Sequence, residues 1–271
     1  MKEIKIKGIT KKETSLIPRS FDVIGDIIVF SNFPFELEKK EKIIGEYFLK
    51  KHKNIKVILK KIKQYSGKFR TAQMRVIAGE RRKETTYIEH GCKFKLHVEK
   101  TYFSPRLSTE RGRIYNQIKK GETILVMFSG IAPYPIIISK NSNAKEIWGI
   151  EINPIAHKYA KENIILNKIK NVKLFLGDVN TVLPKMKKRF DRIIMPLPKG
   201  AGIFLNLALK KIKKEGIIHF YDFFEKEDIP KKAKNKMENV CSRKRFKILD
   251  IIKCGQYSPG KYRICIDFRI L

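Results

Sequence analysis

The 271-residue sequence has few cysteines, few acidic residues and no long apolar run. Its four cysteines include no Cys-x-x-Cys pair and no zinc-ligand spacing, so the sequence predicts reduced thiols and no metal site. No apolar stretch approaches the roughly 18–20 residues that a transmembrane helix needs. The amino-terminal segment MKEIKIKGIT lacks the apolar core of a signal peptide. We therefore expect a cytoplasmic protein with no membrane partner.

What the sequence has in excess is positive charge. Its 60 lysines and arginines outnumber 27 acidic residues, which gives a net charge of +33. Such a surface attracts polyanions, so nucleic acid is the expected partner and an anionic membrane surface is the weaker alternative. No protein partner is evident. The hydrophobic fraction of 42% is enough for a packed core and excludes general disorder.

Short runs of alternating apolar and polar residues dominate the first hundred residues and predict strands. The expected strands cover 3–8, 23–30, 56–62, 75–78, 85–89 and 93–98. One helix is expected at 36–52, where Ile44, Tyr47 and Phe48 lie on one face. Residues 1–100 are therefore predicted to form a small α+β module.

From residue 101 onward, apolar strands alternate with helical patterns. The expected strands are 123–128, 147–152, 172–176, 191–195 and 216–220, with helices at 107–119, 154–167 and 202–213 and a short one between 176 and 191. Asn153 and Pro154 are a plausible cap and first residue for the second helix. This alternation predicts a parallel sheet buried on both faces. Two final runs, 246–254 and 262–270, predict an antiparallel hairpin at its edge. Residues 101–271 should thus form a Rossmann-like α/β domain.

Ligands of open parallel sheets bind beyond the carboxyl ends of the strands. After the first strand comes Phe128-Ser129-Gly130, where the glycine allows a tight turn close to a ligand. The second strand ends in Glu151, 21 residues past Gly130, where an acid can accept hydrogen bonds from both ribose hydroxyls of a nucleotide. Asp178 follows the third strand and is placed to meet the base. The pattern predicts a nucleotide site.

Both NAD and S-adenosylmethionine can use an acid at that position, and three features favour S-adenosylmethionine. The loop at Gly130 has one glycine where a dinucleotide-binding loop has three, as expected for a ligand that has no pyrophosphate to bind. The antiparallel hairpin is foreign to the usual dinucleotide fold. The proline-rich turn 195–198 after the fourth strand would form a rigid wall beside a transferable methyl group, although it is equally typical of a plain strand end.

Several segments, in their order and spacing, resemble the archaeal and eukaryotic tRNA (guanine-37 N1)-methyltransferase family over roughly residues 15–271. They are YFSPRLSTER at 102–111, MFSGIAP at 127–133, IEINP at 150–154, GDV at 177–179 and DRIIMPLP at 191–198. The first is specific, whereas the others occur in many methyltransferases. The resemblance implies a class I methyltransferase domain that uses S-adenosylmethionine and acts on the anticodon loop of tRNA, with the α+β module positioning the tRNA.

The resemblance also implies roles for single residues. Glu110 is expected to remove the N1 proton of guanine, Arg70 to stabilise charge on O6, and Arg111 to bridge cofactor and base. The alternative for Glu110 and Arg111 is a plain helix cap or salt bridge. Pro196 and Pro198 complete the expected catalytic group. The expected cofactor contacts are Tyr102, Arg111, Phe128, Gly130, Glu151, Ile152, Asp178, Val179 and Pro196. Candidate stacking platforms for an extruded base are Tyr102, Phe103, Tyr134, Phe204 and Tyr221, although for any one of them a place in the hydrophobic core is the favoured interpretation.

The sequence departs from the family pattern in two ways. Most members have Asn-Leu-Pro after the fourth strand, where this chain has Pro196-Leu197-Pro198. That variant resembles the archaeal subgroup that also methylates C7 of the tricyclic precursor 4-demethylwyosine, because a proline has no amide to select plain guanine. The extra amino-terminal module that archaeal members carry is expected to be missing, which leaves its contact with the tRNA corner unexplained.

Two other functions stay open at this stage. The related aminocarboxypropyl transferase of wyosine synthesis uses the same cofactor but breaks a different carbon–sulfur bond. A non-catalytic RNA-binding protein with a decayed nucleotide fold is the other alternative, and the presence of Glu110, Arg111, Glu151 and Asp178 argues against it. The preferred prediction is methyl transfer to N1 of guanosine-37, with C7 methylation of the tricyclic precursor as an added hypothesis.

Overall fold

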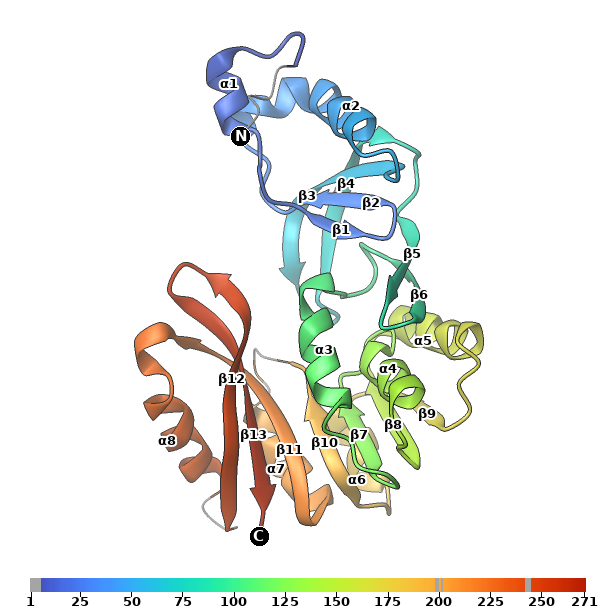
Figure 1. The fold of residues 1–271 in the computed structure, drawn as a ribbon, viewed down its shortest axis with the longest axis vertical. Coiled ribbons are helices and arrows are strands. Elements are labelled where there is room, and N and C mark those ends of the chain that lie inside the picture. The colour runs from blue at the N-terminus through green and yellow to red at the C-terminus, as the bar shows by residue number, and fades with distance from the viewer. Residues whose placement is uncertain (1–5, 198–199, 201, 242–244) are drawn as a thin grey trace. The chain divides into compact units, whose positions relative to one another are not determined.

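The chain folds into two compact units. The computed structural model describes residues 6–197, 200, 202–241 and 245–271. Unit 1 spans Met1–Pro105 and unit 2 spans Arg106–Leu271 (Figure 1). Among the helices of the described ranges, none is long and apolar enough to cross a membrane.

Unit 1 is built from two small sheets and two short α-helices. Its elements are α1 (Lys11–Leu16), β1 (Asp22–Ile24), β2 (Ile27–Phe30), the 3₁₀ helix η1 (Phe35–Lys40), α2 (Glu41–Lys51), β3 (Val57–Ser66), β4 (Thr71–Gly79), β5 (Glu84–Glu89) and β6 (Cys92–His97). Strands β1 to β4 form one sheet in that order, with β2 and β3 parallel, and β5 and β6 form a separate hairpin. The apolar face of α2, with Ile44 and Phe48, packs into a core that includes Phe30 and Ile58.

Most expected elements of unit 1 are present, with different bounds. The strand expected at 23–30 is a hairpin, β1 and β2, because Gly25 turns the chain with φ +58°. A side chain at Gly25 would place its Cβ 2.2 Å from Thr85 Oγ1, so only glycine fits this turn. Residues 6–8 of the strand expected at 3–8 are turn or irregular, and the rest lies outside the described residues. Helix α1 was not predicted.

Unit 2 contains a seven-stranded mixed sheet. Its elements are η2 (Pro105–Leu107), α3 (Ser108–Tyr115), β7 (Thr123–Met127), α4 (Pro133–Asn141), β8 (Glu146–Glu151), α5 (Pro154–Leu166), β9 (Val172–Leu176), α6 (Val179–Lys185), β10 (Phe190–Met195), α7 (Gly202–Lys211), β11 (Ile212–Glu225), η3 (Lys226–Asp228), α8 (Lys231–Val240), β12 (Phe246–Ser258) and β13 (Lys261–Ile270). The strand order is β12-β13-β11-β10-β7-β8-β9, and all neighbours are parallel except those of β13. The predicted Rossmann-like fold with a terminal antiparallel hairpin is confirmed.

Successive residues of the central strands point to opposite faces of the sheet, so alternate residues pack in two separate hydrophobic cores. Leu125 and Met127 of β7 pack in one core with α6, α7 and α8, while Ile124 and Val126 pack in the other with α3 and α4. Helices α4 and α8 were not predicted. Strand β11 runs on past its pairing with β10, and it stays paired with β13 as far as Glu225 (Figure 1).

Candidate active site

The loop between β7 and α4 is tightly wound at the carboxyl edge of the parallel sheet. Phe128, Gly130 and Ala132 all have left-handed φ angles, of 62°, 58° and 66°. The Ser129 N–H donates to the Ile150 carbonyl at 2.9 Å, which fastens the loop to the end of β8. The loop therefore approaches the neighbouring strand closely at the position where the sequence predicts a nucleotide.

Glu151, the last residue of β8, holds this loop from the other side. Its Oε2 accepts a hydrogen bond from the Gly130 N–H at 2.7 Å, and its Oε1 accepts one from the Asn153 N–H at 2.8 Å. Burial raises the pKa of Glu151, although these backbone donors oppose the shift. Asn153 then caps α5 by accepting from the Ile155 N–H at 2.9 Å, with Pro154 in the first turn, as predicted. A carboxylate fixed in this way suits the ribose hydroxyls of a bound nucleoside.

Phe128, Ile152 and Asp178, three further predicted cofactor residues, follow the ends of strands at the same edge. Asp178 caps α6 by accepting from the Asn180 N–H at 2.9 Å, and Val179 behind it is buried. Phe128 packs edge-on against Phe204, with ring centroids 5.0 Å apart. Ile152 is half-buried after β8. Their predicted contacts with the nucleoside of a cofactor, at the ends of β7, β8 and β9, remain predictions.

The last predicted group, the proline turn, follows β10. Pro196 is half-buried directly after the end of that strand. Pro198 lies outside the described residues. The predicted roles of both prolines remain predictions.

Glu110 lies in the first turn of α3 and is only 4% exposed. Arg113, one helical turn later, donates to both of its carboxylate oxygens, each at 2.8 Å. Tyr221 of β11 donates to Oε1 at 2.5 Å, and the Tyr221 hydroxyl lies 3.2 Å from that of Tyr134 in α4. Glu110 is therefore a buried, charge-paired carboxylate.

The contacts of Glu110 place it at the same edge of the sheet as the glycine loop. Tyr221 follows Phe220, which pairs with Met195 at the end of β10. Tyr134 is in the first turn of α4, directly after the loop that Glu151 holds. Arg111 is buried, and its guanidinium carbon lies 6.0 Å from the centroid of the Tyr134 ring. Unit 2 thus brings Glu110, Arg111 and the glycine loop together.

Three of the five candidate stacking platforms are core residues, which is the interpretation that the sequence favours for any one of them. Tyr134, Tyr221 and Phe103 are 3%, 1% and 5% exposed, so they cannot offer a ring face to a base. Tyr134 and Tyr221 instead contribute their hydroxyls around Glu110. The sequence analysis missed this role because the partners lie on distant elements; only Arg113, at the i+3 position from Glu110, could have been found from spacing.

Two predicted site residues belong to unit 1. Arg70 has a left-handed φ of 49° in the turn between β3 and β4, where its N–H donates to the Gly67 carbonyl at 3.2 Å. The Tyr102 ring packs edge-on against Tyr65, with centroids 5.0 Å apart. Their predicted roles at O6 and at the cofactor remain predictions.

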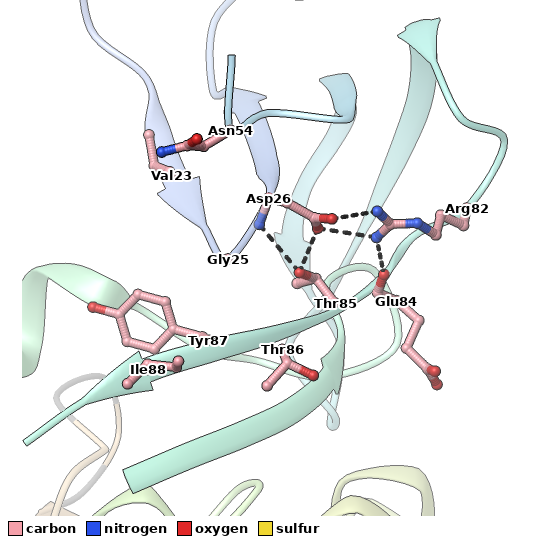
Figure 2. Close-up of a pocket in the computed structure, with 10 residues that line it drawn as sticks. All are labelled: Val23, Gly25, Asp26, Asn54, Arg82, Glu84, Thr85, Thr86, Tyr87 and Ile88. Carbon is pink, nitrogen blue, oxygen red and sulfur yellow. Dashed lines mark hydrogen bonds and ion pairs between the residues drawn. The ribbon is translucent and has the colours of Figure 1, made fainter. Parts of the chain in front are cut away.

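A cavity of about 710 Å³ opens in unit 1 between the β1–β2 turn and β5 (Figure 2). Asp26 points toward Arg82 and Thr85 there and accepts hydrogen bonds from both, with Arg82 Nη1 at 3.0 Å and Thr85 Oγ1 at 2.7 Å. The hydrogen bond from Arg82 lowers the pKa of Asp26. Because these polar groups form hydrogen bonds with one another, we interpret them as a structural link between the strands and do not assign the active site to this cavity.

Comparison with known proteins covers both units. The family described as TRM5/TYW2 methyltransferase domain matches residues 85–249, and the TYW2 N-terminal domain matches residues 1–82. The tRNA (guanine(37)-N(1))-methyltransferase Trm5b of Pyrococcus abyssi is 38% identical over 98% of this chain and 79% of its own length. The tRNA (guanine(37)-N(1))/4-demethylwyosine(37)-methyltransferase Taw22 of Nanoarchaeum equitans is 34% identical, and the match covers 93% of this chain and 100% of that protein.

Solved structures agree with these matches. The crystal structure of Pyrococcus abyssi Trm5b superposes with a TM-score of 0.89 at 36% identity, covering 99% of this chain and 80% of that one. The complex of aTrm5 with tRNALeu has a TM-score of 0.84 at 31% identity, covering 95% of this chain and 73% of that one. By sequence, fold and site, this chain belongs to the TRM5/TYW2 methyltransferase family, whose members use S-adenosylmethionine.

Proposed function

We propose that this chain transfers a methyl group from S-adenosylmethionine to N1 of guanosine-37 in tRNA. The observation that supports it best is the convergence at one sheet edge of the Gly130 loop, the Glu151 carboxylate and the Glu110 carboxylate. A nucleoside site and a buried proton acceptor side by side are what methyl transfer to a protonated ring nitrogen requires. The names of the relatives in Pyrococcus abyssi and Nanoarchaeum equitans support the same substrate position.

Methyl transfer to guanine N1 requires a base and a cation in the active site. Guanine N1 carries a proton and is a poor nucleophile until the proton leaves. Glu110 would accept that proton, and Arg70 would stabilise the negative charge that then develops on O6. The cofactor, when bound, supplies an electrophilic methyl group. Glu151, the Gly130 loop and Asp178 would hold its nucleoside, so that the reacting atoms stay aligned.

The tRNA substrate follows from charge and from loop structure. A net charge of +33 favours a polyanion, and salt-dependent phosphate contacts are expected to dominate affinity. Residue 37 neighbours the anticodon in a loop, where an unpaired base can be turned into a pocket at modest cost. The solved complex of aTrm5 with tRNALeu supports this class of partner. Unit 1 would position the tRNA.

A second substrate is favoured by the turn after β10. Pro196 has no side-chain amide, so it can impose no hydrogen-bond selection for the edge of plain guanine. The relative in Nanoarchaeum equitans, whose name includes 4-demethylwyosine, is 34% identical to this chain. We infer that C7 of the tricyclic base 4-demethylwyosine is methylated at the same site.

The decisive assay uses labelled S-adenosylmethionine with two tRNAs, one carrying guanosine-37 and one carrying the tricyclic base. We expect methyl incorporation into both, located by mass analysis of the digested nucleosides. A tRNA with adenosine at position 37 is the matched control and should remain unlabelled. An aminocarboxypropyl increment on the tricyclic base would replace this proposal with the transferase alternative, and cofactor binding without transfer to either tRNA would contradict it.

Glu151→Gln tests the cofactor site separately. Loss of a charged acceptor to the ribose hydroxyls should weaken S-adenosylmethionine binding by about 10- to 100-fold, the size of one hydrogen bond to a charged group. Titration calorimetry without tRNA measures this directly. Glu146→Gln is the matched control, because Glu146 begins the same strand, far from the ligand edge, and pairs with Lys173 at 2.7 Å. Equal affinities of the two variants would contradict the assignment of Glu151.

A further inference from the structure

A continuous chain of polar side chains runs from the buried Glu110 through the half-buried Arg113 into the sheet. Arg113 donates to Glu110 and also to Asp267 of β13, with Nη1 at 2.6 Å from Oδ2. His219 of β11 lies 2.6 Å from Asp267 Oδ1 through its Nδ1, and 2.7 Å from an Arg192 nitrogen through its Nε2. Asp267 and His219 are 2% and 0% exposed, so water does not compete for the hydrogen bond between them.

The direction of each hydrogen bond follows from chemistry. The Arg192 guanidinium can only donate, so His219 Nε2 accepts and His219 Nδ1–H donates to Asp267. His219 is then neutral, in agreement with its pKa, which burial lowers with help from Arg192 and Arg113 and against the pull of Asp267. Tyr221 donates to Glu110, so Tyr134 donates to Tyr221. Asp267 is an anion: burial opposes its ionisation, but His219 and Arg113 outweigh burial and lower its pKa.

A bound metal ion explains this cluster less well. His219, Cys265 and Asp267 place possible ligand atoms within 4.8 Å of one another. The same Asp267 oxygens already accept from Arg113 and His219, and Arg192 occupies His219 Nε2. Another cation would have to displace or face two guanidinium groups in a buried site, which costs free energy.

Arg113 is shared between two carboxylates, and this division matters for catalysis. The single positive charge of Arg113 faces the two negative charges of Glu110 and Asp267. Glu110 therefore receives only part of the stabilisation that the Arg113 guanidinium can give. Building on the proposed function, we propose that Asp267 and Tyr221 are positioning residues for Glu110 that act in opposite directions. Asp267 holds one side of the Arg113 guanidinium away from Glu110, whereas Tyr221 donates a hydrogen bond to the Glu110 carboxylate.

Within the described part of unit 2, charged and titratable groups from four elements surround Glu110. They are Arg111 and Arg113 of α3, Tyr134 of α4, Tyr221 of β11, and Cys265 and Asp267 of β13. Burial raises the pKa of Tyr134, Tyr221 and Cys265, so these three stay protonated in the working range of pH. In this set only the carboxylates and the guanidinium groups are charged there, so Asp267 is its one carboxylate besides Glu110.

Two variants with opposite expected shifts test the proposal. In Asp267→Asn, Arg113 pairs with Glu110 alone, so the acidic limb of the single-turnover pH–rate profile should move down by about one pH unit and the plateau rate should fall by about tenfold. In Tyr221→Phe, Glu110 loses a donor, so the acidic limb should move up by about half to one unit. If Asp267 and Tyr221 had a purely structural role, both variants would have lower rates but their acidic limbs would not shift in opposite directions.

The controls separate this inference from the proposed function. Asp191→Asn, a carboxylate at the other edge of the same sheet that accepts from the Thr123 N–H at 2.8 Å, should leave the profile in place. The carboxyl resonance of Glu110, labelled with carbon-13 and identified by its loss in Glu110→Gln, reports the same titration in the unliganded protein. Shifts in opposite directions support the proposal even if no tRNA is methylated. Shifts in one direction, or none, overturn it even if wild-type protein is active.

Discussion

Replacing Glu110 with glutamine is expected to lower the single-turnover rate of methyl transfer by about 10²- to 10⁴-fold, the usual contribution of a general base. Glutamine has the same shape but cannot accept the N1 proton. Binding of tRNA should change little, because Glu110 is 4% exposed and its partners are Arg113 and Tyr221. Rapid quench with labelled cofactor gives the rate, and filter binding gives the affinity.

The control for this prediction has to exclude a merely structural role, since Glu110 also forms a buried ion pair with Arg113. Thermal unfolding of Glu110→Gln beside Glu146→Gln reports the structural contribution of each glutamate. A variant that unfolds earlier but transfers methyl groups at the wild-type rate would remove Glu110 from the mechanism. A fall in tRNA affinity at an unchanged rate would do the same.

Replacing Arg192 with methionine should cost about 3–5 kcal/mol of the free energy of unfolding, as expected when one partner of a buried ion pair is removed. Arg192 is 1% exposed and donates to Glu122 at 2.7 and 3.0 Å. It also donates to the Gln117 carbonyl at 2.9 Å and lies 2.7 Å from His219 Nε2. Methionine fills much of the volume but leaves all of these acceptors without their donor, including a charged one. Urea unfolding, with the slope fitted separately, measures the loss.

An exposed ion pair provides the comparison for Arg192→Met. Lys95 and Glu84 in unit 1 lie 3.3 Å apart with side chains 42% and 44% exposed, so Lys95→Ala should change the free energy of unfolding by no more than about 1 kcal/mol. Equal losses in the two variants would mean that the Arg192 network contributes little. The double variant Glu122→Met/Arg192→Met should recover part of the free energy of unfolding that Arg192→Met loses, because it also removes the Glu122 carboxylate that Arg192→Met leaves without its cation.

Local features of the sequence were sufficient for much of unit 2. The apolar run of β7, the Asn153-Pro154 cap of α5 and the position of Glu151 at the end of β8 depend on neighbouring residues, and the structure has all of them. Helix α4 was missed because the run of three β-branched isoleucines at 136–138 lowers the local helix propensity, and burial against the sheet overrides that preference. Helix α8 was missed because half of its residues are charged and only Ala233 and Met237 are buried.

The sequence by itself predicted the two kinds of unit and a ligand edge at the strand ends, because local patterns are set by chain geometry over a few residues. The family and Glu110 as the candidate base came from the resemblance of short motifs to known proteins, and the role of Glu110 stays a prediction. Only the tertiary structure decided what surrounds Glu110: Tyr221 is 111 residues away along the chain, and Asp267 is 154 residues from Arg113. Such contacts follow from the register of β11 with β13 and from the packing of α3 on the sheet, and neither is encoded in any local pattern of residues.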